Sequence, residues 1–329
     1  MKTNKFLILL LIFISLCFAG CNKKQYEGEV IQDYVIKINN NEIKQGEVYT
    51  YFYEVYKNFE SIGGEDIWDT DFDGRTAQEV AKESVLNTLT VVNVCKEKAK
   101  ELNITLTDDE KNEAKSEAEI FFNEIDDKIK SETDIKLEDV INVMEDKVLY
   151  SKVYDYFTKG YVVSEADFDT YWLNAKVSYA DYYTELSIRS IAVNNVEDAQ
   201  EAFTRIKSGV DFSEAYDLFN NSEINPDGKD EKVIYKGDLE YELSADLDIV
   251  KGDLSEPIEY KNGYYLIMID DVKENDESSI RNICKKDYEL TMKNKIFVQE
   301  YSKWEEMAQI KTNDQLWNNI NIDNIVKAY

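Results

Sequence analysis

The chain has 329 residues, and its charge excludes several classes of function. It carries 67 acidic and 38 basic side chains, a formal net charge of −29 at pH 7. This argues against nucleic-acid binding, because such binding relies on Lys and Arg to neutralise phosphates. The chain contains no histidine, so no imidazole can act as a general base or a metal ligand. We therefore expect no cofactor and no metal, and any chemistry must use carboxylates, hydroxyls, tyrosine or lysine.

Residues 1–20 are predicted to be a secretory signal peptide. Lys2 and Lys5 form a positive start, and an apolar run over 6–16 follows it. A positive start, a short apolar run and small residues at its end are the marks of such a signal. The run is also shorter than the ~20 residues that a membrane-spanning helix needs.

Four residues at the end of this segment resemble the lipobox of bacterial lipoproteins. They are Phe18, Ala19, Gly20 and Cys21, with Phe18 where the motif usually has Leu. The resemblance implies cleavage between Gly20 and Cys21 and lipid, such as palmitate, on the Cys21 thiol. The alternative is an ordinary signal peptide with an incidental cysteine. A polar stretch over 21–34 would then tether the body to the outer face of the cell membrane, with the lipid as its only membrane contact.

Residues 35–182 are predicted to form a helical domain. A short strand at 35–38 and a turn precede a helix over 46–59. Aromatic side chains recur along this helix at spacings of three and four: Tyr49, Phe52, Tyr53, Tyr56 and Phe59. That spacing indicates one apolar face, which either packs on a core or forms a groove for a client polypeptide, and the core is favoured. Further helices are expected at 76–102, 107–129 and 135–157, and another begins after Ser164.

The pattern changes at 186, where a small α/β domain over 183–273 is predicted. Alternating residues at 186–193 and 264–272 indicate strands, and two helices lie between 196 and 219. Residues 274–329 form a C-terminal segment that is helical to about 311 and packs on the first domain. Cys95 and Cys284 remain after the signal is removed, and they form either one disulfide or two free thiols.

In this order, the pieces resemble the PrsA- and SurA-type foldases, in which a parvulin domain is inserted in a helical chaperone domain. The matching segments are the opening strand and aromatic helix, the helix junction at 96–110, and the parvulin-like pieces at 188–193, 202–212, 252–257 and 263–269. The resemblance implies an α+β protein. Its helical chaperone-type domain would be built from N- and C-terminal segments, and a parvulin-like α/β domain would be inserted between them.

The chain departs from this family where the chemistry lies. Parvulins carry a histidine on the first strand and another on the last, and here those positions hold Ser190 and Tyr265. The segment between Asp238 and Gly252, which should supply apolar side chains for a substrate proline, is shortened. Ser190 and Tyr265 either keep part of a hydroxyl network or only hold the sheet together, and the second interpretation is favoured. The parvulin-like domain is therefore predicted to be weak or inactive as a peptidyl-prolyl isomerase.

Three functions remain open at this point. The first is a membrane-tethered, extracytoplasmic chaperone or foldase for exported polypeptides. The second is an active isomerase with an altered site, and the third is a non-enzymatic surface lipoprotein with a dedicated protein partner. A calcium site is disfavoured, because the acidic loop that begins at Asp69 has Val80 where the twelfth position of an EF-hand requires Glu.

Overall fold

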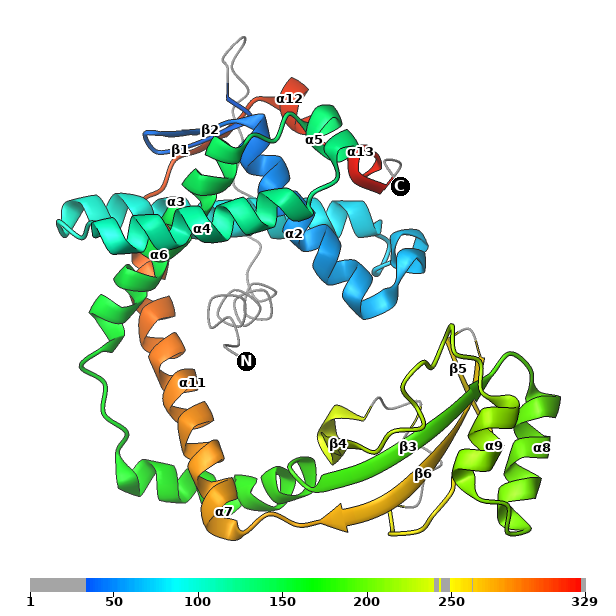
Figure 1. Ribbon diagram of the computed structural model, residues 1–329. Helices are drawn as coiled ribbons and strands as arrows, with labels where there is room; N and C mark the ends of the chain where they lie inside the picture. Colours follow the sequence, from blue (N-terminus) through cyan, green and yellow to red (C-terminus); the bar gives the residue numbers. More distant parts are fainter. Residues whose placement is uncertain (1–33, 240–242, 244–248, 262, 327–329) are drawn as a thin grey trace. The chain divides into compact units, whose positions relative to one another are not determined.

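The computed structural model describes residues 34–239, 243, 249–261 and 263–326 (Figure 1). The predicted signal peptide, Cys21 and nearly all of the predicted tether lie outside the described residues. The chain divides into two compact units, one formed by 1–161 with 293–329 and the other by 162–292. The first is called the helical unit below, and the second the inserted unit. The expected fold class, α+β with an insertion in a helical domain, is confirmed.

The helical unit is built from amphipathic helices whose caps agree with the sequence. Its helices are α2 (Gln45–Gly63), α3 (Ala77–Glu101), α4 (Asp108–Glu124), α5 (Asp127–Thr133) and α6 (Leu137–Thr158), with a short 3-10 helix, η2 (Glu65–Asp69). The predicted capping box at the start of α4 is present: Thr107 Oγ1 accepts from the N–H of Glu110 at 3.2 Å. In return, Glu110 Oε2 accepts from the N–H of Thr107 at 2.7 Å. These bonds satisfy backbone donors that a helix start leaves free.

The prediction of one continuous helix over 107–129 is wrong. Ile125 adopts an extended backbone and ends α4, while its side chain is buried in the core. Asp126 then caps α5, because its Oδ1 accepts from the N–H of Lys128 at 2.7 Å. Burial of one isoleucine and a good N-cap together outweigh the continuation of the helix.

A small sheet joins the beginning and the end of the helical unit. Its strand order is β2 (Asn41–Ile43), β1 (Ile36–Ile38), β7 (Ile310–Thr312), and all neighbours are antiparallel. The predicted helix to about 311 is therefore wrong at its end, because α11 (Glu277–Glu305) stops earlier and 310–312 pair with β1. The tail forms α12 (Asp314–Asn319) and α13 (Asp323–Val326). Its apolar residues Ile320, Ile322 and Ile325 are buried in the core of this unit.

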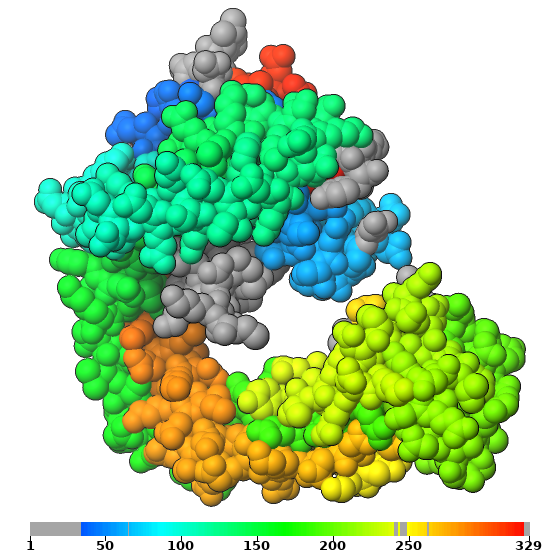
Figure 2. Space-filling view, viewed as in Figure 1, coloured from blue at the N-terminus to red at the C-terminus, as the bar shows by residue number. Residues whose placement is uncertain are grey.

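The aromatic face of α2 belongs to that same core. Tyr49, Phe52, Tyr53 and Tyr56 are all buried, and Phe59 packs against them from a partly buried position. The core interpretation is confirmed, and the client-groove interpretation of this stripe is wrong. In the space-filling view α4, which packs mainly on α6, forms much of the visible face of the unit (Figure 2).

The inserted unit is a four-stranded antiparallel sheet with helices on one face. The strand order is β4 (Lys232–Tyr235), β3 (Glu185–Val193), β6 (Gly263–Lys273), β5 (Ile258–Tyr260). Its helices are α7 (Glu165–Tyr182), α8 (Val196–Lys207), α9 (Phe212–Phe219) and the first part of α11, with a short 3-10 turn, η3 (Lys236–Asp238). Helices α8 and α9 cover Ile191, Val193 and Leu266 on one face of the sheet (Figure 1). The start of α11 packs on α7 through Ile280 and Cys284.

Two further observations concern the whole of the described chain. Cys95 and Cys284 are both free, buried thiols. Within the described residues, no helix combines the length and apolar character that crossing a membrane requires. The predicted domain boundaries at 35–182, 183–273 and 274–329 stay a prediction, although the structure groups 162–182 and 274–292 with the inserted unit.

Buried carboxyl groups lie between α2, α3 and α6. Desolvation by burial raises the pKa of Glu47 and that of Asp146, although Asp146 Oδ2 accepts a hydrogen bond from Lys96 Nζ at 2.7 Å. A carboxyl group whose pKa is raised by folding costs stability while it is ionised. Its protonation therefore favours the folded state as the pH falls through the folded pKa, and this gain is complete below the unfolded pKa.

We expect the helical unit to become more stable as the pH is lowered from about 8 towards the ordinary carboxyl range of about 4, because the raised folded pKa values of Glu47 and Asp146 are passed on the way. A hydrogen bond from the N–H of Thr76 lowers the pKa of Glu79, and hydrogen bonds from Lys152 and from the N–H of Thr107 lower that of Glu110. These two carboxyl groups therefore lose their contribution only at more acidic pH. Urea unfolding at constant ionic strength measures the effect. Glu47→Gln should flatten the profile and Glu79→Gln should not, and a wild-type midpoint that falls over this interval would contradict the assignment.

Candidate functional site

The two predicted site residues lie on neighbouring strands and on one face of the sheet. Ser190 is on β3 and Tyr265 is on β6, where Tyr265 pairs with Ala192. Alternate residues of a strand point to the same face, so Ser190 and Tyr265 are diagonal neighbours. This face lies opposite the one that α8 and α9 cover, where Ile191 and Leu266 are buried. The structure therefore brings the two residues together, as the resemblance implies.

A loop over 220–228 continues the sheet edge beside this face. Strand β4 pairs with β3 only as far as Ile188. Beyond that point the outward backbone groups of Ser190 and Ala192 bond to the loop instead. The N–H of Ser190 donates to the carbonyl of Gly228 at 2.8 Å, and the N–H of Asn221 donates to the carbonyl of Ala192 at 2.7 Å. The loop thus satisfies strand groups that would otherwise be left without partners.

Asparagine side chains complete this pairing. Asn225, which is buried, donates from Nδ2 to the carbonyl of Ser190 and to Oδ1 of Asn220, both at 3.0 Å. Asn220 Oδ1 also accepts from the N–H of Ala192 at 3.0 Å, and its Nδ2 donates to the carbonyl of Asn225 at 2.9 Å. From α9, the hydroxyl of Tyr216 donates to the carbonyl of Asn225 at 3.0 Å. A primary amide suits this place because it offers both donors and acceptors.

The hydroxyl groups of both predicted site residues contact this loop. Ser190 Oγ donates to Oδ1 of Asn225 at 3.3 Å, and Tyr265 Oη donates to the carbonyl of Ile224 at 3.4 Å. Tyr265 also packs edge-on against Tyr260 of β5, with ring centroids 5.5 Å apart. Since the two hydroxyls bond to successive loop residues, the arrangement is that of a structural contact between loop and sheet.

The rest of this sheet face is apolar and covered by the chain itself. Ile258, Ile267 and Ile269 are buried there. Three residues from the shortened segment or its edge pack against them: Leu239, Leu243 and Ile249. Apolar surface that could receive the ring of a substrate proline is therefore in contact with the chain's own side chains. Contact with Leu239, Leu243 and Ile249 removes water from these isoleucines and stabilises the face.

The chemical capacity of the site is limited by its composition. The groups that bond to Ser190 and Tyr265 are hydroxyls, amides and carbonyls, which can donate and accept hydrogen bonds. Within the residues that the structure describes, no group of three or more acidic or cysteine side chains could hold a metal ion. The nearby Arg189 is engaged elsewhere, because Asp270 binds it through two hydrogen bonds of 2.7 and 2.6 Å and raises its pKa.

Sequence reasoning did not single out Asn220, Asn225 or Gly228. The signal was present, because asparagine and glycine recur in a polar stretch directly after α9, and Asn side chains often replace backbone partners in such loops. Gly228 is required sterically: a Cβ there would collide with the Asn225 amide and the Ser190 carbonyl. Whether Ser190 and Tyr265 take part in any catalysis stays a prediction.

The helical unit is made from both ends of the chain, and a four-stranded α/β unit is inserted in it, which is the arrangement that the sequence resemblance implies. Comparison with known proteins shows which proteins the chain is similar to. The family described as SurA-like N-terminal domain matches residues 1–133. The foldase protein PrsA of Caldanaerobacter subterraneus subsp. tengcongensis is 25% identical over 324 residues, covering 94% of this chain and 96% of that protein. The PrsA of Clostridium botulinum strain Loch Maree is 23% identical, covering 91% and 94%.

Solved structures of the same type are also similar. A foldase protein PrsA from Lactococcus lactis has a TM-score of 0.40 at 12% identity, covering 90% of this chain and 99% of that one. The PrsA from Streptococcus pneumoniae has a TM-score of 0.37 at 20% identity, covering 75% and 91%. The sequence matches confirm the predicted resemblance to the PrsA- and SurA-type foldases over nearly the whole chain.

Proposed function

We propose that this protein is a chaperone that assists the folding of exported polypeptides and that its parvulin-like unit has little or no isomerase activity. The similarity to foldase proteins along nearly the whole chain supports a role in polypeptide folding. One observation supports weak or absent isomerase activity. The loop over 220–228 is bonded to the sheet at Ser190, and the remaining apolar face is covered by Leu239, Leu243 and Ile249.

The physical requirements of prolyl isomerisation explain why this observation matters. The barrier of ~18–20 kcal/mol arises from amide resonance, and a catalyst lowers it by binding the twisted amide better than the planar one. That requires a dry pocket for the proline ring and polar groups free to bond to the twisted amide. In this chain the side-chain amides of Asn225 and Asn220 already form hydrogen bonds with the backbone of β3. The apolar residues on this face of the sheet contact one another.

The proposal includes a membrane tether. The sequence from Ala19 to Cys21 supports cleavage before Cys21 and lipid on its thiol. A chaperone without a catalytic step acts through local concentration, so attachment where exported chains emerge would increase its effect. Membrane fractionation of the wild type against Cys21→Ser tests this part. Retention of the variant in the membrane fraction would contradict it.

Suppression of aggregation tests the chaperone function. An unfolded secretory protein is diluted into buffer that contains residues 22–329, and light scattering is followed over time. We expect scattering to fall as the chaperone is added in up to several-fold molar excess. No suppression at that excess would overturn the proposal, and recovery of one stoichiometric partner from the host envelope would favour the alternative of a dedicated partner.

A further inference from the structure

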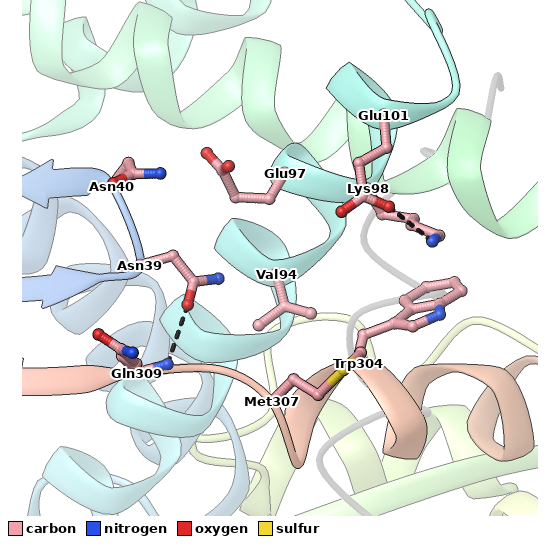
Figure 3. A pocket seen from close by; sticks show the side chains of 9 residues that line it. All are labelled: Asn39, Asn40, Val94, Glu97, Lys98, Glu101, Trp304, Met307 and Gln309. Atoms are coloured by element: carbon pink, nitrogen blue, oxygen red, sulfur yellow. Dashed lines mark hydrogen bonds and ion pairs between the residues drawn. The ribbon is translucent and has the colours of Figure 1, made fainter.

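A pocket of about 430 Å³ lies in the helical unit, between the β1–β2 turn, α3 and the end of α11 (Figure 3). Trp304 lines it from the last turn of α11, Met307 from the turn after this helix, and Val94 from α3. Figure 3 shows Glu97 and Glu101 on the α3 side, facing the same space. Pockets that hold small ligands or short peptide stretches have volumes of about 300–1,000 Å³, so the size is sufficient for a side chain with its flanking backbone.

The walls of this pocket are held in place before any ligand arrives. Asn39 adopts a left-handed backbone conformation with φ of 53°. Its N–H donates to the carbonyl of Gln309 at 2.8 Å, and its Oδ1 accepts from the N–H of Gln309 at 2.9 Å. Trp304 packs against the rings of Phe157 and Phe297, whose centroids lie 4.9 and 6.2 Å from that of the indole. A preformed pocket loses less entropy on binding than one that must first be ordered.

One residue of the rim, Met307, is apolar and largely exposed. Met307 is 73% exposed as a residue, although the indole of Trp304 lines the same pocket. Methionine is flexible and polarisable, and it adapts to apolar partners of different shape. An exposed Met next to a partly buried Trp therefore suits a surface that receives varied apolar side chains.

The polar part of the rim carries Glu97 and Glu101 together with Lys98, whose ammonium lies 5.2 Å from the ring centroid of Trp304. Glu101 is paired with Lys98 at 2.7 Å, but its side chain is still 66% exposed. Glu97 is paired with Lys100 at the same distance and is less exposed. Exposed ion pairs of this kind are weak, so an incoming cation can share these carboxylates. The large excess of acid over base in the chain adds a long-range attraction for cationic segments.

We propose that this pocket binds an extended stretch of unfolded polypeptide that presents one large apolar side chain beside a Lys or Arg. The apolar side chain packs on Trp304, Met307 and Val94, and the cation bonds to Glu97 or Glu101. The side-chain amides of Asn40 and Gln309 line the same space and are placed to bond to the peptide backbone. This inference rests on the proposed chaperone function and gives it a client chemistry.

Fluorescence anisotropy with short labelled peptides tests the inference, using the chain from residue 22. One peptide carries a single Phe between two Lys in a Gly/Ser background. A second replaces Phe with Ala, and a third replaces both Lys with Glu. We expect the first peptide to bind most tightly.

Two variants of the protein test the pocket residues. Met307→Ser should weaken binding of the first peptide by about fivefold, as expected for losing part of a buried Met side chain. Glu101→Lys should weaken it by about two- to fivefold and leave the Glu-flanked peptide unaffected or improved.

The controls separate this inference from loss of fold. Both Met307 and Glu101 are exposed, so their variants should unfold at the wild-type midpoint. Ile120→Ser changes another exposed apolar side chain, on α4 and outside the pocket lining, and should bind as the wild type does. Equal binding of all three peptides, or unchanged binding by both variants, would overturn the inference. If the protein suppresses aggregation but the Met307 and Glu101 variants bind the peptides as the wild type does, only the assignment of this pocket as the client site is contradicted. If the protein binds the peptides at this pocket but does not suppress aggregation, only the chaperone function is contradicted.

Discussion

Lys147→Met is expected to destabilise the helical unit by about 3–5 kcal/mol, the usual cost of leaving one partner of a buried ion pair uncompensated. Lys147 on α6 donates to Glu54 Oε1 on α2, and only 10% and 15% of these side chains are exposed. The other carboxylate oxygen of Glu54 is buried without a hydrogen-bond partner. The ammonium also lies 5.4 Å from the ring centroid of Tyr51. Removing Lys147 leaves the Glu54 carboxyl group buried without its ion-pair partner.

The double variant Glu54→Leu with Lys147→Met should recover most of this loss, because it removes both charges and keeps apolar volume. The matched control is Lys115→Met, which breaks the exposed pair with Glu119 at 3.9 Å and should change stability by less than about 0.5 kcal/mol. Urea unfolding followed by far-UV circular dichroism gives these differences. A cost for Lys147→Met no larger than that of the control would show that the buried pair contributes little.

Asn225→Asp is expected to open the inserted unit, at a cost of roughly 2–5 kcal/mol near neutral pH. The change keeps the size of the side chain but replaces two donors by acceptors. Those donors now bond to the Ser190 carbonyl and to Asn220 Oδ1, so the variant would place oxygen against oxygen. Part of the stability should return at about pH 5, because a carboxyl group in this place has a raised pKa and one O–H donor reappears when it is protonated.

Hydrogen exchange measured on peptides that cover β3 reports this opening, since the inserted unit can unfold locally. The control is Asn221→Asp in the same loop. Asn221 contributes its backbone N–H to β3, and its Oδ1 accepts from the N–H of Glu223, which an aspartate can still do. The change removes only an exposed hydrogen bond from Asn221 Nδ2 to Asn194 Oδ1 at 2.9 Å, which does not involve the strand backbone. Protection of β3 should therefore be lost in Asn225→Asp and kept in Asn221→Asp. Equal protection in both would mean that the asparagine network does not hold the loop.

Local pattern was enough to predict most elements of the fold. The helix of Tyr49 and Phe52, the capping box at Thr107 and the strand before Val193 each follow from a periodicity or a cap that acts within a few residues. The errors fall where tertiary contacts decide. Residues 310–312 become a strand only because β1 offers an edge, and the helix breaks at Ile125 because its side chain reaches the core. No local signal reports the free edge of β1 or the burial of Ile125, although the N-cap residue Asp126 is visible in the sequence.

The candidate site shows the same division. Its two strand positions, Ser190 and Tyr265, were found through the resemblance and do lie on one face of the sheet. The residues that engage them were not found, because the role of Asn225 depends on where β4 stops pairing with β3. The point at which β4 stops pairing with β3 is a property of the assembled sheet. It determines whether the loop over 220–228 hydrogen-bonds to the edge of β3 or stays unattached to it.

The central claim is that this protein protects unfolded clients without accelerating prolyl isomerisation. The most direct measurement is the refolding of a secreted protein whose slow phase is set by a proline and takes tens of seconds or more, with residues 22–329 present in substoichiometric and then in excess amounts. We predict a higher yield of soluble client and an unchanged rate constant for the slow phase. A slow phase accelerated by substoichiometric protein, and restored to its uncatalysed rate by Ser190→Ala or Tyr265→Phe, would contradict the claim and establish a working isomerase.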